Sequence, residues 1–257
     1  MKCHDIPVAN LDTQLPENTH HYSQSILENK IQGVHVQHIA ISGKQPTLDY
    51  YRDGYRTIYL FIKGSGTVIA QNKNYEIAPE SIFLPNVVND FSIQSSNNST
   101  LHYLKISCEL SDQDQINLKA LPAENTQHVY YARFSDCQSY TEAIKSPNTV
   151  SRTILTNEYI PRIAMGTVQT KGPDKVAAHS HPMLEQLFFG LSGNHCIVYA
   201  DDAHIEFPSL SLLHIPLGSN HSVTVKADET MYYVWMDFFL DKSGEQWLET
   251  HHVETNN

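Results

Sequence analysis

The chain contains two series of short segments rich in Val, Ile, Tyr and Phe, and the second series repeats the order of the first. Gly, Asn, Asp, Ser and Pro separate the segments, as is typical of β-strands joined by tight turns. Few stretches have the period of a long helix. We therefore predict an all-β protein, with strands within 57–64, 66–71, 75–85, 101–110, 185–193, 195–202, 210–216, 221–227 and 231–239.

The two series align through their turns. Gly64 lies over Gly193, and Pro85 lies over Pro216. A repeat of about 130 residues with a conserved order of segments predicts two copies of one barrel. The polar stretch 111–160 is expected to connect them, and 244–253 is expected to form a short closing helix.

The composition limits the kinds of molecule that the protein can be expected to bind. The chain has 257 residues, 28 Asp plus Glu against 17 Lys plus Arg, and a formal charge of -11, which disfavours nucleic acid and anionic lipid. The N-terminus lacks the apolar core of a signal peptide, and the apolar run 231–240 is short and carries Asp237. The scattered cysteines form no C-x-x-C pair. We expect a cytoplasmic protein whose thiols are reduced, namely Cys3, Cys108, Cys137 and Cys196.

Histidines mark a candidate metal site in the second repeat. Residues 179–186 are HSHPMLEQ, and residues at i and i+2 of an extended segment share a face, so His179 and His181 can present two imidazoles to one point. His221 follows a Pro-Gly turn in a neighbouring segment. Glu185 and Gln186 point to opposite faces, so only one of them can join the histidines. Transition metals favour imidazole nitrogen combined with oxygen donors.

The pattern H-x-H-x4-[E/Q]-x6-G, followed by P-x-G-x2-H, resembles the two signature motifs of the cupin superfamily. The matching residues are His179, His181, Gln186, Gly193, Pro216, Gly218 and His221. Cupins are antiparallel jelly-roll barrels that usually hold a divalent metal with three His and one Glu. The resemblance covers both repeats and implies a bicupin, two tandem barrels with one divalent metal per chain, either Zn, Mn, Fe or Ni.

One position departs from the family pattern. By its spacing from the turn glycine, Gln186 occupies the place of the usual Glu, and Glu185 lies one residue away. A neutral amide leaves the site more positive by one charge, which favours an anionic substrate bound at the metal. If the register slips by one residue, Glu185 is the ligand instead.

The first repeat lacks the ligand set. Tyr50, Arg52, Thr57 and Asp90 stand where the second repeat has its ligands, and Arg52 cannot bind a metal. We expect an N-terminal barrel over 1–110 that is metal-free and has a structural or oligomeric role, a connector over 111–160, and a metal-binding barrel over 161–257. A pocket in which Arg52 binds an anion is the alternative for the first barrel.

These features favour a metal-dependent enzyme, of isomerase, lyase or hydrolase type, that acts on a small anionic molecule such as a sugar acid or keto acid. The alternatives are an Fe(II) dioxygenase and a small-molecule-binding cupin without catalysis. We expect a homodimer. Candidates for proton transfer are Glu185, Tyr233, His214, Tyr199 and Tyr232.

Overall fold

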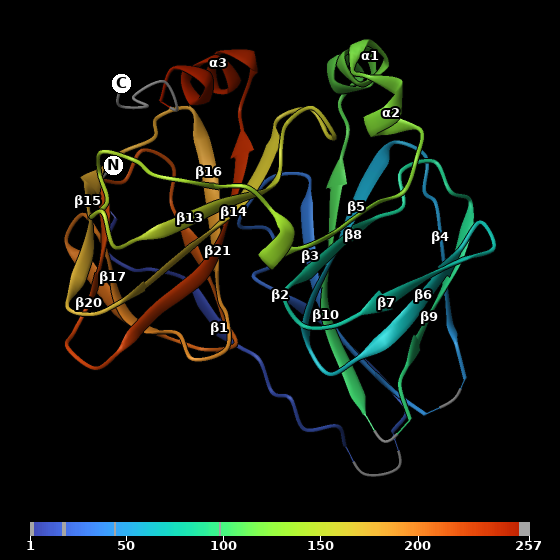
Figure 1. Cartoon of the computed structure of the whole chain (residues 1–257). Helices are drawn as coiled ribbons and strands as arrows, with labels where there is room; N and C mark the ends of the chain where they lie inside the picture. Colours follow the sequence, from blue (N-terminus) through green and yellow to red (C-terminus); the bar gives the residue numbers. More distant parts are fainter. Residues whose placement is uncertain (1–2, 17–18, 44, 98, 252–257) are drawn as a thin grey trace. The chain divides into compact units, whose positions relative to one another are not determined.

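The computed structural model describes residues 3–16, 19–43, 45–97 and 99–251, and the chain divides into two compact units (Figure 1). We call the unit formed by Leu11–Asp136 and Glu158–Pro161 the first barrel. The second barrel comprises Met1–Asn10, Cys137–Asn157 and Arg162–Asn257.

The second barrel consists of two antiparallel sheets. A seven-stranded sheet has the order β1-β19-β16-β21-β14-β13-β12, and its strands along the chain are β1 (Val8–Asn10), β12 (Ser139–Tyr140), β13 (Val150–Leu155), β14 (Ile163–Lys171), β16 (Leu184–Gly190), β19 (Ser211–Ile215) and β21 (Thr230–Phe239). A four-stranded sheet has the order β15-β20-β17-β18, with β15 (Asp174–His179), β17 (His195–Ala200), β18 (Ala203–Pro208) and β20 (His221–Val225).

The first barrel repeats this plan. Its six-stranded sheet has the order β11-β8-β5-β10-β3-β2, with β2 (His21–Ile26), β3 (Val34–Ser42), β5 (Tyr55–Lys63), β8 (Ser81–Leu84), β10 (Thr100–Glu109) and β11 (Tyr130–Arg133). Its four-stranded sheet has the order β4-β9-β6-β7, with β4 (Thr47–Tyr50), β6 (Gly66–Ala70), β7 (Lys73–Ile77) and β9 (Asp90–Ser95). The expected all-β fold with two tandem jelly-roll barrels is confirmed.

The strands form because their side chains alternate between two faces. Along β21, Met231, Tyr233 and Trp235 point into the second barrel, where they join Phe188 of β16 and Val223 of β20 in one buried cluster. Residues of the two sheets thus pack face to face, and burial of this apolar surface stabilises the barrel.

The register of strand pairing matches the repeat found in the sequence. His179 pairs with His221 between β15 and β20, and Tyr50 pairs with Asp90 between the corresponding strands of the first barrel. In the same way Gln186 pairs with Asp237, and Thr57 pairs with Ser107. The equivalence of positions in the two repeats therefore holds at the level of individual strand pairs.

The domain boundaries differ from the expected ones in two places. Residues 3–10 belong to the second barrel, because β1 pairs with β19 and covers one edge of the large sheet. The stretch 111–160 is not one connector, since β11 pairs with β8 in the first barrel while β12 and β13 extend the sheet of the second. Backbone pairing at sheet edges, rather than an apolar pattern, decides both assignments.

Helices are few. The described ones are α1 (Asp112–Ala120), α2 (Ala123–Thr126), the 3-10 turn Phe134–Asp136 and α3 (Lys242–His251). A capping box of Ser111 and Asp114 starts α1. The helix expected over 244–253 corresponds to α3, with 252 and 253 outside the described residues. Among the described helices, none has the length and apolar character needed to cross a membrane.

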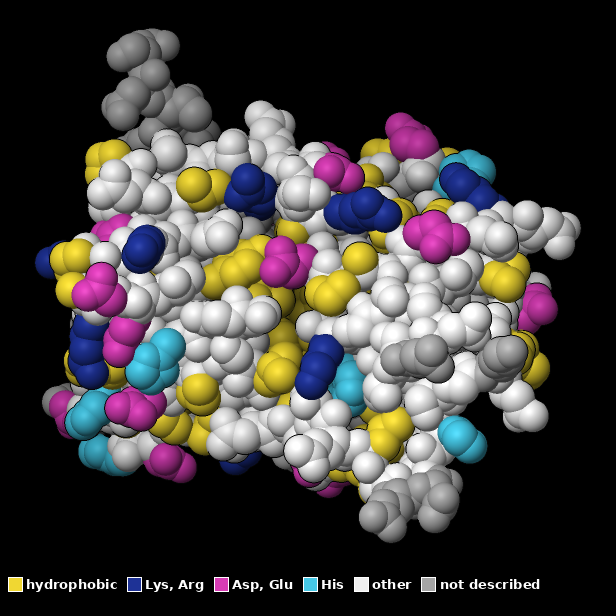
Figure 2. All heavy atoms as spheres, turned by 60° about the horizontal axis from the view of Figure 1, so that its bottom comes forward, with side chains coloured by type: hydrophobic (Ala, Val, Ile, Leu, Met, Phe, Trp, Pro, Cys, Tyr) yellow, Lys and Arg dark blue, Asp and Glu magenta, His cyan; other side chains and the backbone are white. Residues whose placement is uncertain are grey.

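The surface carries charges of both signs. On the face in Figure 2, the Lys and Arg side chains are scattered among acidic, histidine and uncharged side chains. The described residues of this face therefore form no continuous basic surface for a polyanion.

The place of the N-terminal segment can be tested with Ile6, which is 3% exposed in the core of the second barrel. Ile6→Ala should destabilise that barrel by about 2 kcal/mol or more, because it leaves a cavity. Hydrogen exchange should rise in β14 and β19 and stay unchanged in β3 and β10. The control is Ile69→Ala, at a position 39% exposed in the first barrel, with an expected cost below about 0.5 kcal/mol. Faster exchange in the first barrel after Ile6→Ala would contradict the assignment.

Candidate metal centre

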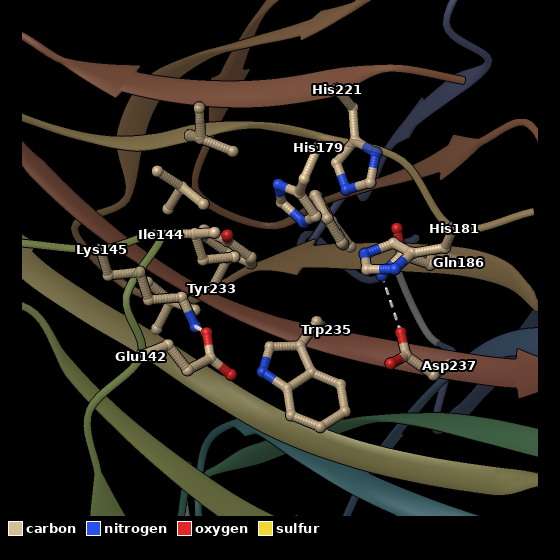
Figure 3. Close-up of a pocket in the computed structure, with 14 residues that line it drawn as sticks. Glu142, Ile144, Lys145, His179, His181, Gln186, His221, Tyr233, Trp235 and Asp237 are labelled. Carbon is tan, nitrogen blue, oxygen red and sulfur yellow. Dashed lines mark hydrogen bonds and ion pairs between the residues drawn. The ribbon is translucent and has the colours of Figure 1, made fainter. Parts of the chain in front are cut away.

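Three histidines converge inside the second barrel. His179 ends β15, His221 begins β20 beside it, and His181 lies in the turn that follows β15. Their candidate ligand atoms all lie within 4.8 Å of one another (Figure 3). The pairing of β15 with β20 brings two of the imidazoles together, and a register shift between Val176 and His179 accompanies it.

Backbone carbonyls orient two of the rings. His179 Nδ1–H donates to the carbonyl oxygen of Ala177 at 2.8 Å, and His221 Nδ1–H donates to that of Ser219 at 3.2 Å. Each ring therefore keeps its proton on Nδ1 and leaves Nε2 to accept or to bind a cation. His221 Nε2 is buried and has no hydrogen-bond partner among the described residues.

Gln186 supplies an oxygen beside the histidines. Its side chain is buried on β16, and its Nε2 donates to Asp237 Oδ1 of β21 at 2.9 Å. Its Oε1 is buried without a hydrogen-bond partner among the described residues. Because a buried amide oxygen without a partner is costly, this atom calls for a cation or a donor beyond those that the described residues supply. Figure 3 shows the Gln186 side chain between Asp237 and the histidines.

Glu185 lies on the other side of the strand. His214 Nε2–H donates to Glu185 Oε2 at 2.8 Å, and neither residue lines the cavity that contains the three histidines. Two of the expected proton-transfer candidates therefore pair with each other away from that cavity. The reason is the two-residue period of the strand, which sends Glu185 and Gln186 to opposite faces.

Of the tyrosine candidates, only Tyr233 lines the cavity. Burial raises the pKa of its hydroxyl well above the usual value, so Tyr233 stays protonated and acts as a hydrogen-bond donor. Tyr199 is exposed and stacks on His204. Tyr232 is not among the cavity-lining residues.

The cavity measures about 60 Å³, enough for a few water molecules or the reacting end of a small ligand. Its walls are mostly apolar, formed by Ile144, Val168, Val176, Phe188, Val223 and Trp235. Trp235 fits because Gly166 faces it, and a Cβ at Gly166 would come within 2.3 Å of the indole ring.

Three charged residues of the cavity wall were not expected as site residues: Glu142, Lys145 and Asp237. Glu142 and Lys145 belong to the stretch that was expected to be a connector, where no motif marks them. Asp237 was noted only as a charge within an apolar run. Its place opposite Gln186 in β21 follows from strand pairing, which depends on the exact register.

Burial dominates the ionisation of the site. It raises the pKa of Asp237 to about 7, opposed by the hydrogen bond from Gln186. Burial, reinforced by the neighbouring His179, lowers the pKa of His221 to about 3, so this ring is neutral at pH 7, as a metal ligand must be. Burial also lowers the pKa of Lys145, and the neighbouring Glu142 carboxylate partly offsets this.

The first barrel has no comparable centre among its described residues. At the equivalent positions, Tyr50 is 61% exposed, Asp90 is exposed, and the guanidinium of Arg52 stacks on the Tyr55 ring at 3.8 Å. Thr57, the counterpart of Gln186, pairs with the hydroxyl of Ser107 at 3.2 Å. The interior is filled instead by aromatic rings, those of Tyr59, Phe61, Phe83, Phe91 and Tyr103.

No protein-family model and no curated protein matches the sequence. Solved structures do match over almost the whole chain. A glyoxylate-induced protein from Pseudomonas aeruginosa has a TM-score of 0.71 at 10% identity and covers 92% of this chain and 90% of its own. An oxalate decarboxylase from Lactobacillus farciminis, solved as a formate complex, has a TM-score of 0.65 at 12% identity, with 97% and 92% covered. A cupin 2 conserved barrel domain protein from Leptotrichia buccalis has a TM-score of 0.60 at 13% identity, with 93% and 99% covered. The chain therefore has the cupin fold, in two tandem copies.

Proposed function

We propose that the second barrel binds one divalent transition metal through His179, His181, Gln186 and His221, and that the protein is a metal-dependent enzyme acting on a small anionic molecule. The observation that carries this proposal is the buried Oε1 of Gln186, which has no hydrogen-bond partner among the described residues and lies beside three convergent imidazoles. Three nitrogen donors and one oxygen donor suit Zn, Mn, Fe or Ni.

Asp237 supports the ligand role of Gln186. An amide can turn either its oxygen or its nitrogen toward the histidines, and only the oxygen can bind a cation. The acceptor Asp237 holds the nitrogen on its own side, so the oxygen is left for the metal. Groups that orient ligands in this way raise the affinity of metal sites.

The charge of the proposed site favours an anion. All four ligands are neutral and Glu142 and Lys145 cancel each other, so among the cavity-lining residues only Asp237, with its pKa of about 7, can partly offset the charge of a divalent ion. When bound, the metal acts as a Lewis acid on a carbonyl or carboxylate of the substrate. The apolar walls exclude water, which strengthens these electrostatic interactions, and the protonated Tyr233 can donate to a substrate oxygen. Isomerase, lyase or hydrolase chemistry on a keto acid or sugar acid fits such a site.

The metal content of the purified protein gives the first test. We expect about one divalent metal per chain, since only the second barrel has the ligand cluster among the described residues. His179→Ala together with His181→Ala should lower the metal affinity by orders of magnitude, because half of the ligands are lost. Elemental analysis after dialysis measures both, with His195→Ala/His204→Ala at exposed positions as the control. Two metals per chain would refute the single site, and iron as the native metal would favour a dioxygenase.

The identity of the oxygen ligand gives the second test. Gln186→Glu should keep the metal, since Asp237, with its pKa near 7, can hold a proton and donate it to the new carboxylate. Measured at about pH 6, where Asp237 is already largely protonated, the added negative charge should weaken acetate binding by about tenfold or more. Glu185→Gln should leave metal content and acetate affinity unchanged and cost about 1 kcal/mol of stability through its bond to His214. If Glu185→Gln removes the metal and Gln186→Ala retains it, Gln186 is not the ligand.

A further inference from the structure

A segment before β13 forms one wall of the cavity with Glu142, Ile144 and Lys145. Strand pairing fixes it at two points, where β12 pairs with β13 and Lys145 forms a bridge with Val176. The amide of Ala177 also donates to the carbonyl oxygen of Ile144 at 2.8 Å. These side chains are thus held in place before a ligand arrives.

Asp174 secures the end of this segment. Its Oδ2 accepts from the hydroxyls of Ser146 at 2.6 Å, Thr149 at 3.1 Å and Thr170 at 2.8 Å. Burial of the carboxylate acts to raise its pKa, but these hydrogen bonds outweigh burial and keep the pKa below the usual value. The Asp174 carboxylate therefore stays ionised and binds the segment to β15 at neutral pH.

Glu142 and Lys145 form a buried ion pair, with side chains 11% and 7% exposed. Lys145 Nζ also donates to Ser151 Oγ at 3.0 Å. An ammonium has three N–H groups, so one remains after these two bonds among the described residues. The Glu142 carboxylate also accepts from Tyr140, and a carboxylate has further acceptor sites beyond these two. Buried ion pairs contribute little to stability compared with apolar residues of the same size, so stability alone does not account for this pair.

The pair faces the same cavity as the histidines. In Figure 3, Glu142 and Lys145 lie away from the three imidazoles, near Tyr233 and Trp235. The pair is neutral as a whole, and it offers the cavity both a donor and an acceptor. A second anionic group gains little from a neutral pair, whereas a hydroxyl can donate to Glu142 and accept from Lys145 at once.

We propose that Glu142 and Lys145 form a subsite for a hydroxyl group of the substrate, whose anionic end binds at the metal centre. This inference rests on the proposed function and narrows its substrate class to small hydroxylated acids, in preference to plain keto acids. The aromatic and aliphatic walls of the cavity, formed by Trp235, Tyr233 and Val168 among others, contact the carbon chain between the two polar ends.

The test compares ω-hydroxy acids of three to six carbons with the unsubstituted acids of the same length, by calorimetry on the metal-loaded protein. At least one hydroxy acid should bind about tenfold or more tightly than its counterpart, because a buried hydrogen bond to a charged group is strong. The double variant Glu142→Gln/Lys145→Met, which removes both charges of the pair together, should lose this preference and keep its metal. No preference at any length in the unmodified protein, or an equal preference in the double variant, overturns the proposal.

Two controls separate the possible failures. Glu206→Gln/Lys175→Met changes the same residue types at exposed positions of the same barrel and should keep the preference. A protein that binds no metal refutes the proposed function, whereas a metal-loaded protein that binds the hydroxy acid and the unsubstituted acid equally at every length refutes the subsite alone. If the double variant does not fold, the NMR signal of the Lys145 ammonium in the unmodified protein tests the subsite instead. It should shift with the hydroxy acid and not with the unsubstituted acid, and an equal response to both contradicts the subsite.

Discussion

The hydrogen bond from Gln186 to Asp237 is the interaction on which the candidate centre depends. It joins β16 to β21 in the large sheet, and it determines which atom of the amide is left for the histidines. The same bond ties the ligand set to the carboxyl of Asp237, whose pKa burial raises to about 7. The pairing of β16 with β21 in the core therefore also determines which atom of Gln186 faces the histidines.

The two barrels fill the same interior in different ways. Where the second barrel has Phe188 beside a cavity, the first has Tyr59, whose ring contacts Phe83, Phe91 and Tyr103. Aromatic packing of this kind stabilises a core through buried area and ring contacts, and it leaves no place for a ligand cluster. The two copies of the fold thus differ inside, because the first is packed with aromatic rings and the second retains a cavity.

Much of this could be predicted from the sequence, because strands, turns and the histidine motif are local patterns. The period of two residues along β16 also indicated that only one of Glu185 and Gln186 could face the histidines. The pair of Glu142 and Lys145 could not be found, since its segment is polar and aperiodic and is placed by backbone bonds to Val176 and Ala177. Asp237 could not be identified as a residue of the site either, because its place depends on the exact register of β21. A homodimer and a cytoplasmic location stay predictions.

The pairing of β1 with β19 has a consequence for folding. Val8 and Leu213 lie about 200 residues apart along the chain, and such distant pairs close slowly because the entropy of a long loop must be lost first. During synthesis the strand Val8–Asn10 emerges early and waits, unpaired, until Ser211–Ile215 has been made. Over this interval the unpaired backbone groups of Val8–Asn10 are open to strand pairing with neighbouring nascent chains.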